Sequence, residues 1–157
     1  MIGKPVVQVE VKNVLATSAG SAIFLGNDEK VFVIYVDHFV GSAINTFLHG
    51  TPKPRPQTHD LFADALTALG ARVERVVVND FSDTVFYARL ILVAENELEE
   101  RKIVEIDARP SDSIALAVQA GAPIYVAAHV WESVEDMSEV LKKMQDANDE
   151  GLGGFSE

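Results

Sequence analysis

Apolar and polar residues follow one another along the chain with periods that predict where strands and helices form. Residues 6–14 largely alternate between apolar and polar side chains, as in a strand with one buried face. Residues 21–25 and 31–36 are almost entirely apolar, which is typical of strands buried on both faces. Gly26 and Asn27 begin the segment between them, so we expect these two strands to form a hairpin.

Two helices are predicted after this strand-rich start. Residues 39–48 repeat apolar side chains every three or four positions, and Gly50 is a stop signal. Residues 51–57 contain three prolines, which remove backbone donors, so we expect a stiff, extended connector. Thr58 is then expected to cap a helix over residues 59–69. The apolar side chains of this second helix form one stripe, which we expect to be buried: Leu61, Phe62, Ala65, Leu66 and Leu69.

The second half of the chain predicts strands again before its last helices. The expected strands cover residues 72–79, 84–93, 101–107 and 123–127, and the expected helices cover residues 111–120 and 132–147. Strands that cluster, instead of alternating one-for-one with helices, predict an α+β fold with mixed or largely antiparallel sheets. Residues 33–37 resemble residues 103–107, since both end a strand in Asp before a helix. This similarity indicates either a strand–strand–strand–helix unit used twice or a chance likeness of apolar strands.

Length and composition indicate one hydrophobic core with an acidic end. The chain has 157 residues, of which 48% are hydrophobic, and it has no cysteine, so we expect no disulfide framework. Residues 1–131 are predicted to form the domain, and residues 132–157 an acidic helix followed by a frayed tail. No apolar run is long enough to predict a membrane span, and the N-terminus lacks a signal-peptide layout, which favours a cytoplasmic protein.

The net charge of −11 disfavours a nonspecific grip on a nucleic-acid backbone, because that grip needs Lys and Arg. The acidic residues are concentrated in residues 95–100 and 132–157, and the rest of the chain is close to neutral. A nucleic-acid site would therefore depend on a local cluster of basic side chains.

The segment Asp107-Ala-Arg-Pro-Ser-Asp112 carries more charge than a strand-to-helix turn requires. Ser111 is expected to cap the helix, Pro110 suits its start, and Asp112 suits the helix dipole. Asp107 and Arg109 have no such local role, and two interpretations stay open. Either they form an ion pair that braces the turn, or Asp107 and Asp112 hold Mg²⁺ while Arg109 binds phosphate.

A second polar cluster surrounds the proline-rich connector, where Lys53 and Arg55 precede Thr58, His59 and Asp60. His59 and Asp60 fall in the first turn of a predicted helix, where a phosphate would meet free N–H groups. His59 is thus a candidate general acid or base. The structural alternative is that Thr58 caps the helix, Asp60 stabilises its dipole and His59 packs against neighbours. The sequence contains no phosphate-binding loop, dinucleotide-binding, zinc-protease or serine-hydrolase motif.

Four segments resemble the bifunctional nuclease domain family in the same order and at fitting separations: residues 55–61, 86–88, 107–116 and 121–126. The similarity extends over residues 8–131. It implies an α+β domain that forms a homodimer and degrades both DNA and RNA. Nucleic acid is then the partner, and Mg²⁺ or Mn²⁺ is the cofactor expected to assist hydrolysis.

The resemblance also implies roles for particular residues. The catalytic candidates are His59, Asp60, Asp107 and Arg109, and the metal candidates are Asp107 and Asp112. The residues implied in substrate binding are Arg55, Thr58 and Ser111. Catalysis by this set requires the turn at residues 58–60 and the turn at residues 107–112 to meet in space.

One position departs from the family pattern. Val40 and Gly41 stand where the family typically has Glu and Ala, and Asp37 is the nearest carboxylate that could replace the glutamate. This departure favours a second hypothesis, in which the chain is a non-catalytic dimeric binding or regulatory module. The motif residues would then form a structural bracing network.

Overall fold

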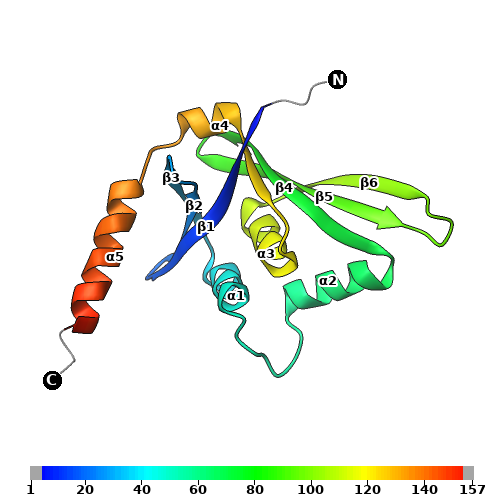
Figure 1. Cartoon of the computed structure of the whole chain (residues 1–157), viewed down its shortest axis with the longest axis horizontal. Coiled ribbons are helices and arrows are strands. Elements are labelled where there is room, and N and C mark those ends of the chain that lie inside the picture. The colour runs from blue at the N-terminus through cyan, green and yellow to red at the C-terminus, as the bar shows by residue number, and fades with distance from the viewer. Residues whose placement is uncertain (1–4, 154–157) are drawn as a thin grey trace.

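The structure is a computed structural model that describes residues 5–153 of the backbone and the side chains of residues 5–150. Its elements follow the chain in this order: β1 (Val6–Thr17), β2 (Gly20–Gly26), β3 (Val31–Val36), α1 (His38–His49), α2 (Thr58–Ala68), β4 (Ala71–Ser82), β5 (Val85–Glu95), β6 (Arg101–Ala108), α3 (Pro110–Ala120), β7 (Ile124–Ala127), α4 (Ala128–Ser133) and α5 (Ser138–Gly153). Each strand predicted from the sequence is present, which confirms the α+β class (Figure 1).

Within the described residues, the strands form one seven-stranded mixed sheet in the order β3-β2-β1-β7-β4-β5-β6. Neighbouring strands are antiparallel except for the parallel pair β4 and β7. The order strand–strand–strand–helix occurs twice, as β1-β2-β3-α1 and as β4-β5-β6-α3. The short strand β7 pairs with β1 on one side and β4 on the other, so it joins the two halves into one sheet.

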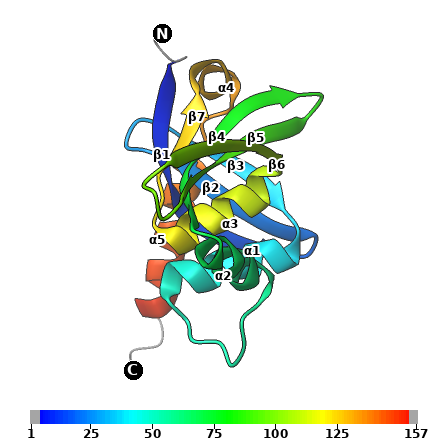
Figure 2. The same cartoon turned by 90° about the vertical axis from the view of Figure 1, so that its right-hand side faces the viewer.

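Helices α1, α2 and α3 gather on the same side of the sheet (Figures 1 and 2). Helices α1 and α3 pack against each other, and Ile44 and Ile114 from these helices are fully buried in the main core. Both helices end at a glycine in the left-handed conformation, Gly50 at φ 61° and Gly121 at φ 66°, which satisfies the last carbonyls without steric strain. This pairing places the starts of α1 and α3 next to each other.

Strand β2 is buried on both faces, as its continuous apolar run predicts. Ile23 and Leu25 face the main core beneath the helices, whereas Ala22 and Phe24 join a second cluster with Leu141 of α5. Because successive strand residues point to opposite faces, helix α5 covers the face of β2 that α1 and α3 leave open.

The predicted single helix over residues 132–147 is wrong, because the chain breaks it into α4 and α5. At the break, the backbone N–H of Met137 donates to the carbonyl of Val31 at 2.6 Å. The carboxylate of Asp136 accepts from the N–H groups of Val31 and Ser138 at 3.2 and 3.0 Å. Apolar spacing alone indicated an unbroken helix, but pairing with the edge of β3 prevails. Helix α5 continues through Gly153, and residues 154–157 of the expected tail lie outside the described residues.

Helix α2 departs from prediction at its cap and at its apolar stripe. Its cap is Gln57, not Thr58, and Gln57 and Asp60 form a reciprocal capping box. Most of the stripe predicted to be buried faces outward, with Leu61, Phe62 and Leu69 exposed by 65%, 40% and 81%, whereas Leu66 packs on the main core. The period of the sequence identifies an apolar face correctly, but it does not say what covers that face.

None of the helices within residues 5–153 is long and apolar enough to cross a membrane.

Candidate functional site

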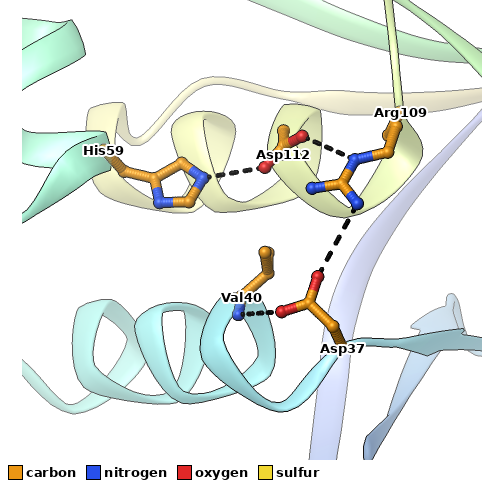
Figure 3. A network of polar contacts seen from close by, with 5 residues as sticks. All are labelled: Asp37, Val40, His59, Arg109 and Asp112. Carbon is orange, nitrogen blue, oxygen red and sulfur yellow. Dashed lines mark hydrogen bonds and ion pairs between the residues drawn. The ribbon is translucent and has the colours of Figure 1, made fainter.

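The two polar segments that catalysis required to meet are in contact. Nε2 of His59, in the first turn of α2, lies 3.1 Å from Oδ1 of Asp112 in the first turn of α3 (Figure 3). The packing of α2 on α3 next to the α1–α3 pair brings these turns together. This contact shows that the turn at residues 58–60 and the turn at residues 107–112 lie side by side.

Arg109 and Asp37 extend this contact into a chain of four side chains. Nε of Arg109 donates to Oδ2 of Asp112 at 2.9 Å, and Nη1 of Arg109 lies 3.7 Å from Oδ2 of Asp37. The other oxygen of Asp37 accepts from the backbone N–H of Val40 at 3.0 Å, which caps α1 (Figure 3). We call His59, Asp112, Arg109 and Asp37 the polar network.

The polar network is open to solvent at its Arg109 end. The side chains of Arg109 and Asp37 are exposed by 65% and 44%, those of Asp112 and His59 by 36% and 14%. Arg109, Asp37 and Ser111 line a hollow of about 350 Å³, which we call the Arg109 hollow. A ligand can therefore reach the guanidinium directly, while His59 is half enclosed behind Asp112.

Electrostatics fix the charges of the central pair. Partial burial acts to raise the pKa of Asp112, but hydrogen bonds from Arg109 and His59 outweigh it, so this pKa lies below its ordinary value. The hydrogen bond to Asp112, followed by its charge, raises the pKa of Arg109. The pair is therefore a carboxylate and a guanidinium at neutral pH.

Asp60 belongs to a different set of contacts, although it is adjacent to His59 in sequence. Its Oδ2 accepts from Lys53 Nζ and from the backbone N–H of Gln57, and its Oδ1 accepts from Nε2 of Gln119 on α3 at 2.9 Å. The hydrogen bond from Lys53, then that from Gln57, lowers the pKa of Asp60. Lys53 also lies 4.4 Å above the ring of Phe47. Asp60 thus ties the proline-rich connector and α2 to α3.

Of the contacts that Asp60 makes, the sequence contains a recognisable motif only for the one with Gln57. Gln57 and Asp60 have the spacing of a capping box, which a search for Ser or Thr caps overlooks. Lys53 and Gln119 come from segments without any motif, and only the folded chain brings them to Asp60.

Asp107 lies apart from the polar network. Asp107 on β6 is opposite Arg89 in the register of the antiparallel strands β5 and β6. Both residues line a separate polar hollow with Tyr87 and Asp80. Alternation along β6 explains this placement, because Asp107 and Ala108 point to opposite faces of the sheet. The structure therefore does not bring Asp107 and Asp112 together.

The remaining predicted residues are placed around the network without joining it. Arg55 and Thr58 are exposed on the connector and at the start of α2. Ser111 is buried, with 7% of its surface exposed, and it does not cap α3 as predicted, because Arg109 holds the cap position and no side chain caps that helix. Pro110 is in the first turn of α3, as predicted.

The residues at the site do not fit a divalent ion held by protein ligands alone. Among the described side chains, no group of three or more His, Asp or Glu residues is placed to hold a metal ion. Both oxygens of Asp112 already accept from Arg109 and His59, and both oxygens of Asp60 are engaged by Lys53 and Gln119. Val40, with 6% exposure, is the apolar neighbour of this network on α1, and its side chain points toward Asp112 (Figure 3).

A curved mixed sheet with a His–Asp–Arg network at the starts of its helices defines a small α+β domain with a solvent-exposed polar site. The chain belongs to the bifunctional nuclease domain family, whose model matches residues 23–139. The match includes every member of the polar network.

Two uncharacterized proteins of Mycobacterium tuberculosis, from strains CDC 1551 / Oshkosh and ATCC 25618 / H37Rv, are each 38% identical to the chain over 100 residues. The aligned segment is 64% of this chain and 56% of each relative. The chain thus spans little more than half the length of the curated relatives it matches.

Proposed function

We propose that the chain hydrolyses phosphodiester bonds of DNA and RNA at the polar network. The observation that supports this most strongly is the contact between His59 and Asp112 next to an exposed Arg109, because one carboxylate then joins a titratable imidazole to a solvent-exposed cation. Family membership supports the same class of activity.

Arg109 is the proposed phosphate-binding group. Its Nε is used by Asp112 and its Nη1 faces Asp37, but the side chain is 65% exposed and lines the Arg109 hollow, so a ligand can still reach the guanidinium. Charge-assisted hydrogen bonds from this group would position a phosphodiester and stabilise the negative charge that develops on it. The two carboxylates hold the guanidinium in one orientation before substrate arrives.

His59 is the proposed general acid or base. In the neutral tautomer that donates from Nε2 to Asp112, the other ring nitrogen, Nδ1, is free to accept a proton from an attacking water. Once protonated, the same imidazole can donate to the leaving oxygen. Asp112 fixes the tautomer and orientation of the ring and does not itself transfer the proton. Asp112 is the single residue that separates His59 from Arg109 in the network.

No step is assigned to a metal ion, since the carboxylates at the site do not fit one. Mg²⁺ or Mn²⁺ remains a proposed cofactor only if substrate phosphate and water supply most of its ligands, as they do in many Mg²⁺ sites. Comparison of cleavage in Mg²⁺ with cleavage in EDTA distinguishes hydrolysis that needs a metal ion from hydrolysis that does not.

We also propose that the chain forms a homodimer through the outward face of α2. Leu61, Phe62, Ala65 and Leu69, which we call the α2 stripe, form a continuous exposed apolar surface on the helix that carries His59. A second copy that covers this stripe would bury the surface the sequence pattern predicts to be buried. The dimer would also hold the His59 turn against α3.

The alternative function is a binding or regulatory module in which the polar network is only a brace. Two observations favour it: both oxygens of Asp112 are engaged, and apolar Val40 lies beneath the network. The two functions differ in what loss of His59 does. A brace loses stability, whereas a nuclease loses turnover at unchanged stability.

The test is cleavage of fluorescent single-stranded DNA and RNA by wild type, His59→Ala and His129→Ala, purified side by side. His129 is a matched control, because it is an exposed histidine on α4 whose ring faces Asp80. We expect His59→Ala to lower kcat by roughly 10²–10⁴-fold and His129→Ala to leave it unchanged. Equal cleavage by all three proteins would point to a contaminating nuclease and overturn the proposal.

A further inference from the structure

A groove continues from the Arg109 hollow along the outer edge of β3. A second hollow of about 420 Å³ lies beside the first, and both are lined by Tyr35, Thr84 and Phe86. Because they share these residues, they form one groove between the edge strand β3 and the turn that joins β4 to β5. We call it the β3 groove. It begins at Arg109 and ends at Met137.

The β3 groove presents aromatic side chains along its length. Tyr35 is 76% exposed and Phe81 is 39% exposed, and both line the second hollow. The ring of Phe86 lies 4.3 Å from that of Phe81 and 5.9 Å from that of Phe32, which is buried in the core. This stack anchors Phe81 to the core and fixes one wall of the groove. Large exposed rings on a rigid wall are suited to flat, apolar ligand faces.

Charge is distributed unevenly along the groove. Arg109 is the basic residue among those that line it, and Asp37 and Glu135 are the acidic ones. A phosphate therefore finds a favourable partner only at the Arg109 end. At the Met137 end, the carboxylate of Glu135 disfavours phosphate, and the aromatic rings favour neutral, planar groups.

We propose that the β3 groove is a base-stacking subsite for single-stranded nucleic acid, in which Tyr35 and Phe81 stack on bases next to a phosphate held by Arg109. This inference rests on the proposed function, because it assigns the substrate path that leads to the polar network. A nucleotide strand combines planar, neutral rings with one phosphate per unit. Its phosphate would bind at the Arg109 end of the groove, and its neighbouring bases would lie against the aromatic side chains. Stacking on aromatic side chains accepts every base, so it is compatible with both DNA and RNA.

The subsite selects single strands over duplexes. In a duplex the faces of the bases are covered by their neighbours, and unstacking them costs free energy that a single strand does not have to supply. With one basic side chain in the groove, binding also depends weakly on salt. We expect a slope of log K against log salt of about −0.7, the value for one neutralised phosphate on a single strand.

The test measures the binding of an oligothymidylate of about a dozen nucleotides, a typical single-strand length, by fluorescence anisotropy. The full-length chain carries His59→Ala, so that the oligonucleotide stays intact. A matched abasic strand of equal length retains the phosphates and removes the bases. We expect Tyr35→Ala to weaken binding of the oligothymidylate about tenfold, Tyr35→Phe to retain it, and the abasic strand to bind weakly to every variant.

Tyr87→Ala is the matched control, because Tyr87 is an exposed tyrosine on β5 that lines the separate hollow with Asp107. Its affinity should equal that of the parent. Equal binding of the abasic strand, equal binding of a duplex, unchanged affinity of Tyr35→Ala, or no binding by the parent would each overturn the subsite. Stacking-dependent binding without cleavage by wild type would uphold the subsite and refute the nuclease proposal. Cleavage by wild type, with a KM that does not change in Tyr35→Ala, would uphold the nuclease proposal and refute the subsite.

Discussion

Nε2 of His59 lies 3.1 Å from Oδ1 of Asp112, although 53 positions separate the two residues in sequence. Each residue is in the first turn of its helix, and each helix follows a segment whose charges exceed what its fold requires. The contact brings these charges together, and Asp112 also accepts a hydrogen bond from the solvent-exposed Arg109. Substitutions at Arg109, at Asp60, at Val40 and in the α2 stripe each have an expected outcome that can be measured separately.

Arg109→Lys should lose most activity, because a lysine retains the charge but not the fork of donors. Arg109 reaches Asp112 through Nε and Asp37 through Nη1, and one ammonium cannot reproduce both contacts and still bind phosphate. We expect kcat/KM to fall by roughly 10²–10³-fold. The free energy of unfolding should change by less than about 1 kcal/mol, since the side chain is exposed. Near-normal kinetics in the lysine variant would show that only charge matters.

Asp60→Asn should destabilise the fold in a pH-dependent manner. The hydrogen bond from Lys53, then that from Gln57, lowers the pKa of Asp60 in the folded state. The ionised carboxylate therefore stabilises the fold above its unfolded pKa of about 3.9, and this stabilisation is lost as pH falls through the lower folded pKa. We expect a loss of about 1.5–3 kcal/mol at pH 7 that disappears in acid.

Urea unfolding of wild type and Asp60→Asn from neutral to acid pH measures this difference. Asp64→Asn is the control, because Asp64 is exposed on the same helix. A difference that stays constant into acid would contradict the assignment of the stabilisation to ionised Asp60.

Val40→Glu should create a divalent-ion site that the wild type lacks. Val40 points toward Asp112 and neighbours Asp37, so a glutamate there adds a third carboxylate to the network (Figure 3). In EDTA the variant should lose roughly 1–3 kcal/mol of stability, because a charge replaces a buried methyl group. Mg²⁺ should then raise its melting temperature, whereas Val40→Gln should not respond. Equal responses of the two variants would rule out an ion held by the added carboxylate.

Substitution within the α2 stripe should separate the proposed dimer. Leu61→Ser combined with Leu69→Ser removes two of its most exposed apolar side chains. Leu98→Ser is the control, because Leu98 is 78% exposed in the β5–β6 connection and is not part of the α2 stripe. Light scattering after size exclusion should give a dimeric mass for wild type and the control, and a monomeric mass for the double variant. A monomeric wild type at all concentrations would contradict the dimer.

The sequence predicted the strands and α3, because each depends on local periodicity. It gave the meeting of the two polar turns only as a condition for catalysis, since no local pattern reports which segments pack together. It did not predict that Asp107 leaves the site, since the alternation of side chains along β6 becomes decisive only when the neighbouring strands are known. Nor did it predict the cap at Gln57 or the break before α5. In both cases a contact with a distant segment, Gln119 to Asp60 or Met137 to Val31, accompanies the local choice.

Helix α2 shows the same limit from another side. Its apolar stripe was identified from spacing, but of that stripe only Leu66 packs on the main core, beside half-buried His59, and the other members face outward. Spacing reports that a helix has an apolar face, and only tertiary packing or a partner decides which face is covered.

In the proposed function, His59 and Asp112 act as one unit in phosphodiester cleavage. A double-mutant cycle on kcat for single-stranded RNA tests it most directly, with His59→Ala, Asp112→Asn and the double variant, all confirmed as folded. We predict that each single variant loses activity and that the double variant is no slower than His59→Ala alone. Losses that multiply, or no loss in His59→Ala, would show that the two residues do not form a catalytic pair.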